Sequence, residues 1–214
     1  NLLKQKNSSS DISCTAGQMP RLLGLAQASK VYRALPNAAA EGFSDHGNEV
    51  AWGTIGNAST SEGHFFETLN AAGVMQVPMV MSVWDDEYGI SVPKEYHTTK
   101  ESISEVMKGF VRDDKHAGIE LMVVNGWDYP ALYEAYQKAA AIAREQHVPV
   151  LVHVRELTQP QGHSTSGSHE RYKSAERLEW EKEFDCISKM REWILASGYA
   201  TEEELATIEQ QAKK

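Results

Sequence analysis

The apolar residues of the chain gather in short runs that alternate with longer amphipathic segments. A short apolar run bounded by polar or glycine-containing turns is typical of a buried strand. The segments between the runs repeat apolar residues at intervals of three and four, which indicates helices that bury one face. The pattern predicts strands at 49–55, 77–83, 119–124 and 148–154, and helices at 19–33, 65–73, from about 102, and 129–146.

The alternation of strands and helices predicts the α/β class, with a parallel sheet covered by helices on both faces. A polar segment at 159–174 follows the last predicted strand, and the rest of the chain has a helical pattern. In that last part, Thr201 and Glu204 have the spacing of a helix capping box. We therefore expect an α/β domain over 1–175 and a helical tail over 176–214.

Composition and charge narrow the functional classes. The formal net charge is −9 over 214 residues, so an anionic nucleic acid would be repelled and is not an expected partner. No apolar run reaches the length needed to cross a membrane. Two cysteines, Cys14 and Cys186, are too few for a disulfide framework, so we expect a reduced protein in the cytoplasm, with a bacterial source favoured. The chain begins at Asn1 rather than Met, which predicts a fragment or a processed part of a longer chain.

Residues 56–63, Gly-Asn-Ala-Ser-Thr-Ser-Glu-Gly, join a predicted strand to a predicted helix. Small residues let the backbone approach a ligand closely, and the free N–H groups at the start of a helix attract an anion. A diphosphate would suit such a turn. The alternative is a tight turn that is rich in glycine and serine for conformational reasons alone, and this segment by itself does not decide between the two.

An acidic triplet, Asp85, Asp86 and Glu87, follows the next predicted strand. Because the carboxyl ends of parallel strands share one edge of a sheet, Asn57 and Asp86 are expected to come close together. An amide oxygen, a carboxylate and a backbone carbonyl suit Mg²⁺ that is already held by a diphosphate. The alternative is a solvated acidic loop without a ligand.

The combined motif, Gly56-Asn57-Ala58 followed after residues 59–84 by Asp85-Asp86, resembles the thiamin-diphosphate motif, whose usual form is Gly-Asp-Gly and then Asn-Asn. Further segments occur in the order found in the α subunits of branched-chain and pyruvate dehydrogenase E1 components. The chain from about Gln18 to its end therefore resembles that family, which implies the thiamin-diphosphate-binding fold. The segments are Thr60-Ser61-Glu62-Gly63, Tyr88-Gly89-Ile90-Ser91-Val92-Pro93, Asn125-Gly126-Trp127-Asp128, Gly162-His163-Ser164-Thr165-Ser166 and Arg171-Tyr172-Lys173.

The cofactor motif departs from the family at three positions. Asn57 stands where the family has its metal-binding Asp, Asp86 where it has its metal-binding Asn, and Ala58 replaces the second Gly. The exchange keeps two oxygen ligands and one negative charge, so the resemblance still implies Mg²⁺, held by Asn57, Asp86 and the backbone carbonyl of Tyr88. The implied contacts to the cofactor include these residues together with Gly56, Ala58, Ser59, His163 and, in a weaker alignment near the pyrimidine, Ser13 and Thr15.

His163 lies in the polar loop after the last predicted strand. A single histidine in a loop is ordinarily solvated, but the resemblance implies that this one is catalytic and helps transfer the acyl group to the lipoyl carrier. Ser164 and Ser166 match positions that are phosphorylated in mitochondrial relatives, where phosphate would add negative charge beside the cofactor. We predict no regulation from this match, because a bacterial source need not contain the kinase.

The resemblance implies an E1 component of a 2-oxo acid dehydrogenase complex, which uses thiamin diphosphate and Mg²⁺ for oxidative decarboxylation and transfers the acyl group to lipoylated E2. The expected partners are E2 and a β-type E1 half, as a subunit or a fused domain, in a homo- or hetero-oligomer. A branched-chain 2-oxo acid is favoured over pyruvate. Because the β half supplies further catalytic residues in the family, the chain alone is expected to be inactive. The alternatives are another thiamin-diphosphate enzyme, of transketolase or sulfopyruvate-decarboxylase type, and a structural homologue without cofactor.

Overall fold

The computed structural model describes residues 12–35, 44–159, 161–163 and 168–213. Within these residues, four strands form one parallel sheet in the order β1-β2-β6-β5. The four strands overlap the four predicted apolar runs, which confirms the parallel α/β class. They are β1 (Ala51–Gly56), β2 (Met79–Trp84), β5 (Glu120–Asn125) and β6 (Val150–Arg155).

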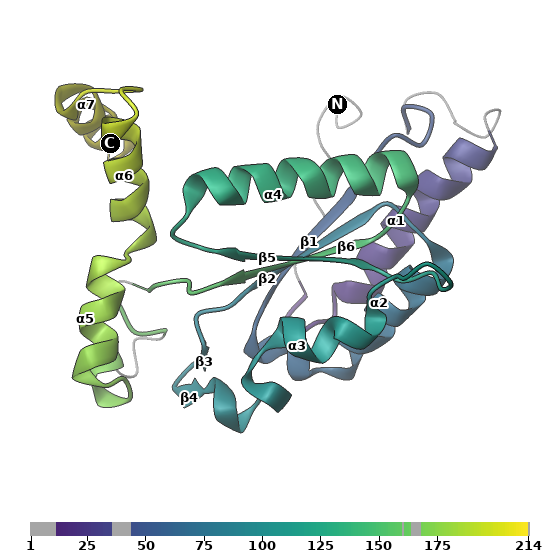
Figure 1. Cartoon of the computed structure of the whole chain (residues 1–214), viewed down its shortest axis with the longest axis horizontal. Helices are drawn as coiled ribbons and strands as arrows, with labels where there is room; N and C mark the ends of the chain where they lie inside the picture. Colours follow the sequence, from purple (N-terminus) through teal and green to yellow (C-terminus); the bar gives the residue numbers. More distant parts are fainter. Residues whose placement is uncertain (1–11, 36–43, 160, 164–167, 214) are drawn as a thin grey trace.

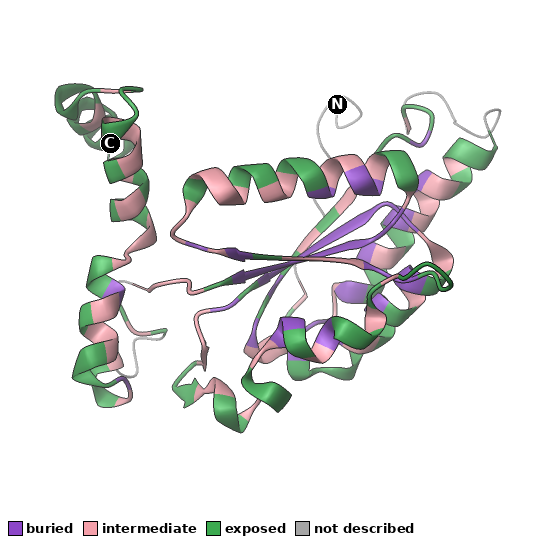
Figure 2. Cartoon of the chain, in the orientation of Figure 1, coloured by how far each residue is buried: buried purple, intermediate pink, exposed green. Residues whose placement is uncertain are grey.

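Helices cover both faces of the sheet, as predicted (Figure 1). On one face, α1 (Met19–Ala34), α2 (Gly63–Met75) and α3 (Ile103–Met107) enclose the larger apolar core. On the other face, α4 (Tyr129–Ala141) packs over β5 and β6. Successive residues of a strand point to opposite faces, so β2 contributes Met79, Met81 and Val83 to the first core and Val80 to the second. Figure 2 shows the buried residues concentrated on the strands and on the helix faces turned toward them.

Helix α1 lies close to β1 because the strand carries a glycine at the contact. A Cβ atom on Gly53 would lie 2.5 Å from the side chain of Leu22, so a larger residue there would require the Leu22 side chain to move. The buried residues of α1 recur at intervals of three and four, which is the pattern that predicted the helix. They are Met19, Leu22, Ala26 and Ser29.

The helix predicted at 129–146 is α4 followed by a π-helical turn, Ile142–Gln146. Asp128 caps the start of α4, since its carboxylate accepts the N–H of Ala131 at 3.1 Å. The π turn ends at His147, which has a left-handed backbone conformation with φ of 54°. The predicted segment is therefore helical throughout, but its last turn is wider than an α-helical one.

The segment 85–99, which begins with the acidic triplet, contains short elements that the sequence did not predict. Two short strands, β3 (Tyr88–Gly89) and β4 (Val92–Pro93), pair antiparallel, and two 3₁₀ turns, Lys94–Tyr96 and Thr99–Glu101, follow them. Strands of two residues bury too little to leave an apolar pattern in the sequence, which explains why they were not predicted.

The helical tail consists of α5 (Ala175–Glu183), α6 (Cys186–Ala196) and α7 (Glu202–Ala212). The predicted capping box is confirmed: Thr201 Oγ1 accepts the N–H of Glu204 at 3.3 Å, and the Glu204 carboxylate accepts the N–H of Thr201 at 2.8 Å. Figure 1 shows the tail standing beside the edge of the sheet toward which the strands point. The division into a domain over 1–175 and a tail over 176–214 stays a prediction.

Across the described part of the chain, none of the helices is both long and apolar enough to cross a lipid bilayer.

Candidate functional site

The predicted phosphate turn begins directly at the end of β1. The N–H of Asn57 donates to the carbonyl of Trp84 at 3.0 Å, which joins the turn to the end of β2. Residues Ala58–Ser61 then form a 3₁₀ turn, in which Thr60 Oγ1 donates to the carbonyl of Asn57 at 2.6 Å. The space next to the Gly56 Cα is open, because an added Cβ would meet only Ser59 Oγ, at 3.9 Å. The turn is thus anchored to the end of β2 and leaves room at the position expected for a diphosphate.

Asn57 is buried, with 4% of its surface exposed, yet its side-chain Nδ2 has no hydrogen-bond partner among the described residues. Buried polar groups in proteins are almost always hydrogen-bonded, so an unpartnered amide indicates a missing ligand. Because Nδ2 is a hydrogen-bond donor, it suits an acceptor such as a diphosphate oxygen, and a metal ion would have to bind the Oδ1 atom of the same side chain.

Asp85, the first residue of the acidic loop, is used for structure. Its carboxylate accepts a hydrogen bond from His153 Nε2 at 2.8 Å and another from the N–H of Glu87 at 2.8 Å. Burial alone would raise the pKa of the Asp85 carboxyl, but these hydrogen bonds and the charge of Lys94 outweigh burial and hold that pKa below its ordinary value. Asp85 is therefore a buried anion that anchors the start of the loop to β6.

Asp86, the predicted metal ligand, has a different environment. Its carboxylate accepts the N–H of Tyr88 at 3.2 Å, and no basic side chain in the described part of the chain forms an ion pair with it. Burial raises the pKa of Asp86 above its ordinary value, although the N–H of Tyr88 and the charge of Lys173 act in the opposite direction. A partly buried carboxylate without an ion-pair partner is an environment in which a bound metal ion would be favourable.

The phosphate turn and the acidic loop touch each other. A Cβ on Gly89 would lie only 2.6 Å from the methyl group of Ala58. Ala58 therefore packs against the loop that carries Asp86 and Tyr88, and only glycine fits at position 89 with the backbone in this place. This contact brings together the two segments that sequence analysis joined into one motif.

Two basic residues around the start of α5 also reach the acidic loop. Arg177 on α5 donates to the carbonyl of Asp86 at 3.1 Å and forms an ion pair with Glu87. Lys173, just before α5, lies with its Nζ 5.0 Å from the centre of the Tyr88 ring. The contacts of Arg177 join the loop to a part of the chain that the sequence assigned to a separate region.

The remaining predicted site residues are His163, Ser13 and Thr15. His163 is exposed, and its backbone N–H donates to the hydroxyl of Tyr172 at 3.5 Å, while the Tyr172 ring packs against Tyr88 at 5.7 Å between centres. Ser13 and Thr15 are exposed in the turn that leads into α1, and in the described part of the chain they make no hydrogen bond to the phosphate turn. Ser164 and Ser166 lie outside the described residues.

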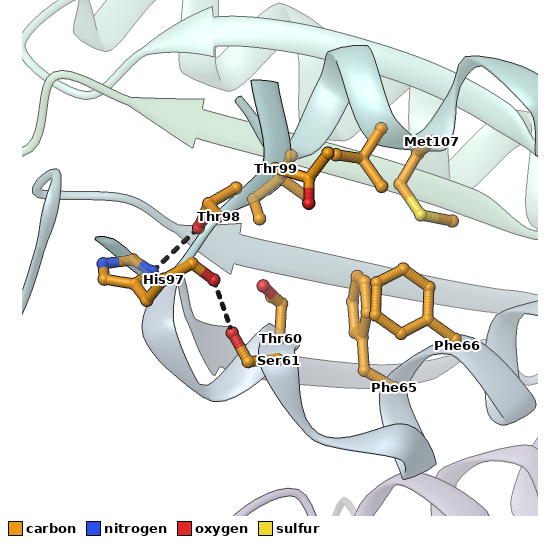
Figure 3. A pocket seen from close by; sticks show the side chains of 10 residues that line it. Thr60, Ser61, Phe65, Phe66, His97, Thr98, Thr99 and Met107 are labelled. Atoms are coloured by element: carbon orange, nitrogen blue, oxygen red, sulfur yellow. Dashed lines mark hydrogen bonds between the residues drawn. The ribbon is translucent and has the colours of Figure 1, made fainter. Parts of the chain in front are cut away.

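A cavity of about 230 Å³ lies beside the end of the phosphate turn, between the start of α2 and α3 (Figure 3). Phe65, Phe66 and Met107 form its apolar wall, and Thr60, Thr98 and His97 line its polar end. None of the residues predicted for cofactor or metal lines this cavity.

Sequence analysis missed His153, Arg177 and Lys173 as residues that shape the site. The spacing of Arg177 and Glu181 is typical of an ion pair on a helix, and the structure contains that pair at 2.8 Å. No local pattern could show that Arg177 also reaches Glu87, because the two residues are far apart in the sequence.

The donor set defines which metal could bind. Among the described residues there is no group of three or more His, Cys, Asp or Glu side chains that could hold a metal ion. One amide, one carboxylate and one carbonyl would leave a cation dependent on oxygens from a ligand, which is how Mg²⁺ is usually bound beside phosphates. The residues present therefore fit a magnesium diphosphate.

Comparisons with known proteins give one consistent family. A family model described as "Dehydrogenase E1 component" matches residues 4–214. The pyruvate dehydrogenase E1 component subunit alpha of Rickettsia bellii is 29% identical over 167 residues, covering 78% of this chain and 48% of the relative. The mitochondrial 2-oxoisovalerate dehydrogenase subunit alpha 2 of Arabidopsis thaliana is 31% identical over 185 residues, covering 84% of this chain and 37% of the relative.

A third relative, the pyruvate dehydrogenase E1 component subunit alpha of Acholeplasma laidlawii, is 31% identical over 192 residues, covering 88% of this chain and 49% of the relative. The chain spans half the length of these relatives or less. Because the family model matches nearly all of it, the chain belongs to the dehydrogenase E1 component family.

Proposed function

We propose that this chain is the cofactor-binding α part of a 2-oxo acid dehydrogenase E1 component, which binds thiamin diphosphate with Mg²⁺. The observation that carries the proposal is the unpartnered, buried amide of Asn57 at the edge of the sheet where the Asp86 loop also lies. Membership of the E1 family and the similarity to pyruvate and 2-oxoisovalerate dehydrogenase α subunits support it.

In this proposal the metal is held by the side-chain oxygens of Asn57 and Asp86 and by the carbonyl of Tyr88. Gly56, Ala58 and Ser59 line the diphosphate. The exchange of amide and carboxylate relative to the family leaves one negative charge among the protein ligands, so the charge balance with Mg²⁺ and diphosphate is unchanged. When bound, thiamin diphosphate supplies the electron sink that makes decarboxylation of a 2-oxo acid feasible.

His163 is proposed to act on the acyl group as it passes to the lipoyl arm of E2. Its imidazole is exposed rather than buried in the sheet, so it can meet a group delivered from outside. The contact of its backbone with Tyr172, and of Tyr172 with Tyr88, supports a position near the metal loop.

The remaining parts of the proposal concern substrate and partners. We propose a branched-chain 2-oxo acid as the preferred substrate over pyruvate, a β-type E1 half as subunit or fused domain, and lipoylated E2 as acceptor. Assembly as a homo- or hetero-oligomer and a cytoplasmic location in a bacterium belong to the same proposal. The α-subunit relatives support its general form, and the choice of substrate is left to experiment.

The test begins with calorimetric titration of the chain with thiamin diphosphate in the presence and absence of Mg²⁺. We expect Mg²⁺-dependent binding, and no decarboxylation of 3-methyl-2-oxobutanoate or pyruvate by the chain alone. Addition of a β-type E1 half should then produce decarboxylation, faster with the branched-chain acid.

Two outcomes would contradict parts of this proposal. Absence of cofactor binding both alone and with the β-type half would favour a structural homologue without cofactor. Decarboxylation by the isolated chain would show that the site does not need a second half.

A further inference from the structure

We propose that Arg177 on α5 is a positioning residue for the metal site, because it sets the shape of the loop that carries Asp86 and Tyr88. The inference rests on the proposed function for the identity of the metal, but the loop contacts that carry it are independent of that function.

Each nitrogen of the Arg177 guanidinium group contacts either the acidic loop or Glu181 on the same helix. Nη2 donates to the carbonyl of Asp86 at 3.1 Å, Nη1 pairs with the carboxylate of Glu87, and Nε donates to Glu181 at 2.8 Å. The side chain is mostly buried, so solvent competes little with these contacts. One planar fork thus joins two consecutive loop residues to α5, which a single ammonium group could not do.

The loop needs such support because its backbone is in an unfavourable conformation. Glu87 has φ of 70°, in the left-handed region that non-glycine residues seldom adopt. Its N–H is held by Asp85, its carbonyl accepts the N–H of Lys94 at 2.8 Å, and its carboxylate lies between Lys94 and Arg177. Although burial raises it, the pKa of Glu87 lies below its ordinary value because Lys94 and Arg177 stabilise the anion.

The neighbouring Tyr88 is held by residues around the start of α5. Its ring lies 5.7 Å from the ring of Tyr172, 5.0 Å from Lys173 Nζ and 5.7 Å from the Arg177 guanidinium. Lys173 is itself oriented by a buried ion pair with Glu181, at 2.7 Å, and Glu181 also binds Arg177. The two cations and their shared carboxylate therefore form one unit that fixes the tyrosine side chain.

These contacts determine where the predicted metal ligands lie. Asp86 and Tyr88 flank Glu87, so rotation of the Glu87 backbone would move the Asp86 carboxylate and the Tyr88 carbonyl relative to each other. Arg177 touches neither predicted ligand oxygen, since it contacts Asp86 through its backbone carbonyl. Its effect on Mg²⁺ is thus through the position of the loop.

The experiment compares Arg177→Gln, Arg177→Lys and a control, Arg191→Gln. Arg191 pairs with Glu202 and Glu209 on α7, so it matches Arg177 as a tail arginine with two carboxylate partners but does not contact the loop. The measurements on the chain are Mg²⁺ affinity at saturating thiamin diphosphate, amide hydrogen exchange of Glu87 and Tyr88, and the thermal unfolding midpoint.

We expect Arg177→Gln to weaken Mg²⁺ binding by about tenfold or more, as removal of groups that orient metal ligands usually does. Arg177→Lys should lie between Arg177→Gln and the unaltered chain, and Arg191→Gln should bind Mg²⁺ normally. The Glu87 and Tyr88 amides should exchange faster only in the Arg177 variants. A role in general stability alone would lower the unfolding midpoint without changing Mg²⁺ affinity.

The inference is overturned if Arg177→Gln and Arg177→Lys match Arg191→Gln in both Mg²⁺ affinity and loop exchange. If Arg177→Gln does not fold, the same comparison is made with Arg177→Lys. Failure of the unaltered chain to bind thiamin diphosphate and Mg²⁺ would contradict the proposed function instead. In that case hydrogen exchange still decides: selective loss of protection at Glu87 and Tyr88 supports the positioning role, and unchanged protection refutes it.

Discussion

The two halves of the candidate site are held in place in different ways. The phosphate turn after β1 is stabilised by near neighbours, with Thr60 bonded to Asn57 and one anchor to the end of β2. The acidic loop after β2 has a local partner in Lys94, but it also depends on distant residues, since His153 on β6 holds Asp85 and Arg177 on α5 holds Glu87. The turn can therefore form from local sequence, whereas the loop acquires all of its contacts only when β6 and α5 are in place.

A metal bound between the halves would therefore join the phosphate turn, which depends on near neighbours, to the acidic loop, which also depends on the placement of β6 and α5. The contact between Ala58 and Gly89 is where the two meet. Variants that disturb one half and spare the other can show whether this distinction is correct.

The largest effect is expected from the charge of the predicted metal ligands. Asp86→Asn removes the one carboxylate of the set and should weaken Mg²⁺ binding by about 100-fold, because affinity for Mg²⁺ depends strongly on ligand charge. Asn57→Asp combined with Asp86→Asn moves the charge to the other half of the site and should restore binding. Calorimetric titration with Mg²⁺ at saturating thiamin diphosphate measures both.

The single variant Asn57→Asp serves as the control for this exchange, because it retains Asp86 and should still bind Mg²⁺. If the double variant binds no better than Asp86→Asn, the two side chains do not share one metal ion. The candidate site would then be confined to one half.

The next effect concerns the anchor of the loop. His153→Ala removes one partner of a buried pair and leaves the Asp85 anion without its hydrogen bond from the imidazole, so the free energy of unfolding should fall by about 3 kcal/mol. Urea denaturation measures the loss. His116→Ala is the matched control, because His116 forms a similar contact with Asp113 on the surface and its removal should leave the unfolding midpoint unchanged.

A smaller effect is expected where the two halves touch. Gly89→Ala would place its Cβ 2.6 Å from the methyl group of Ala58, and overpacking of this kind costs about 1–3 kcal/mol. Ala58→Gly should relieve the collision, so the double variant should be more stable than Gly89→Ala alone. Gly109→Ala is the control, since an added Cβ there meets nothing within 4 Å. Additive effects of the two changes in denaturation experiments would contradict the contact.

What the sequence could predict follows the same division. The strands and the Thr201 capping box were predicted because each depends on a local pattern, a buried apolar run or a spacing of three residues. The proximity of Asn57 to the acidic loop was predicted from the rule that parallel strands end at one edge. The hydrogen bond between His153 and Asp85 was not predicted, because it requires β6 to lie next to β2, and the apolar pattern does not specify strand order.

The contact of Arg177 with Glu87 was beyond sequence analysis for a related reason. Both residues look like ordinary solvated charges in the sequence, one on a helix and one in a loop. Only the position of α5 beside the carboxyl ends of the strands makes them partners. The residue types expected in the metal site could be named, but the residues that hold them in position could not.

The smallest effect is expected inside the phosphate turn. Thr60→Val removes the buried hydroxyl that donates to the Asn57 carbonyl, and loss of one such hydrogen bond costs about 1 kcal/mol. Thr60→Ser keeps the hydroxyl and should retain most of the stability measured by urea denaturation. Since the turn is held locally, hydrogen exchange of Glu87 and Tyr88 should be the same in Thr60→Val as in the unaltered chain. Faster exchange of these two amides in Thr60→Val would show that the acidic loop depends on the turn, and that the two halves form one cooperative unit.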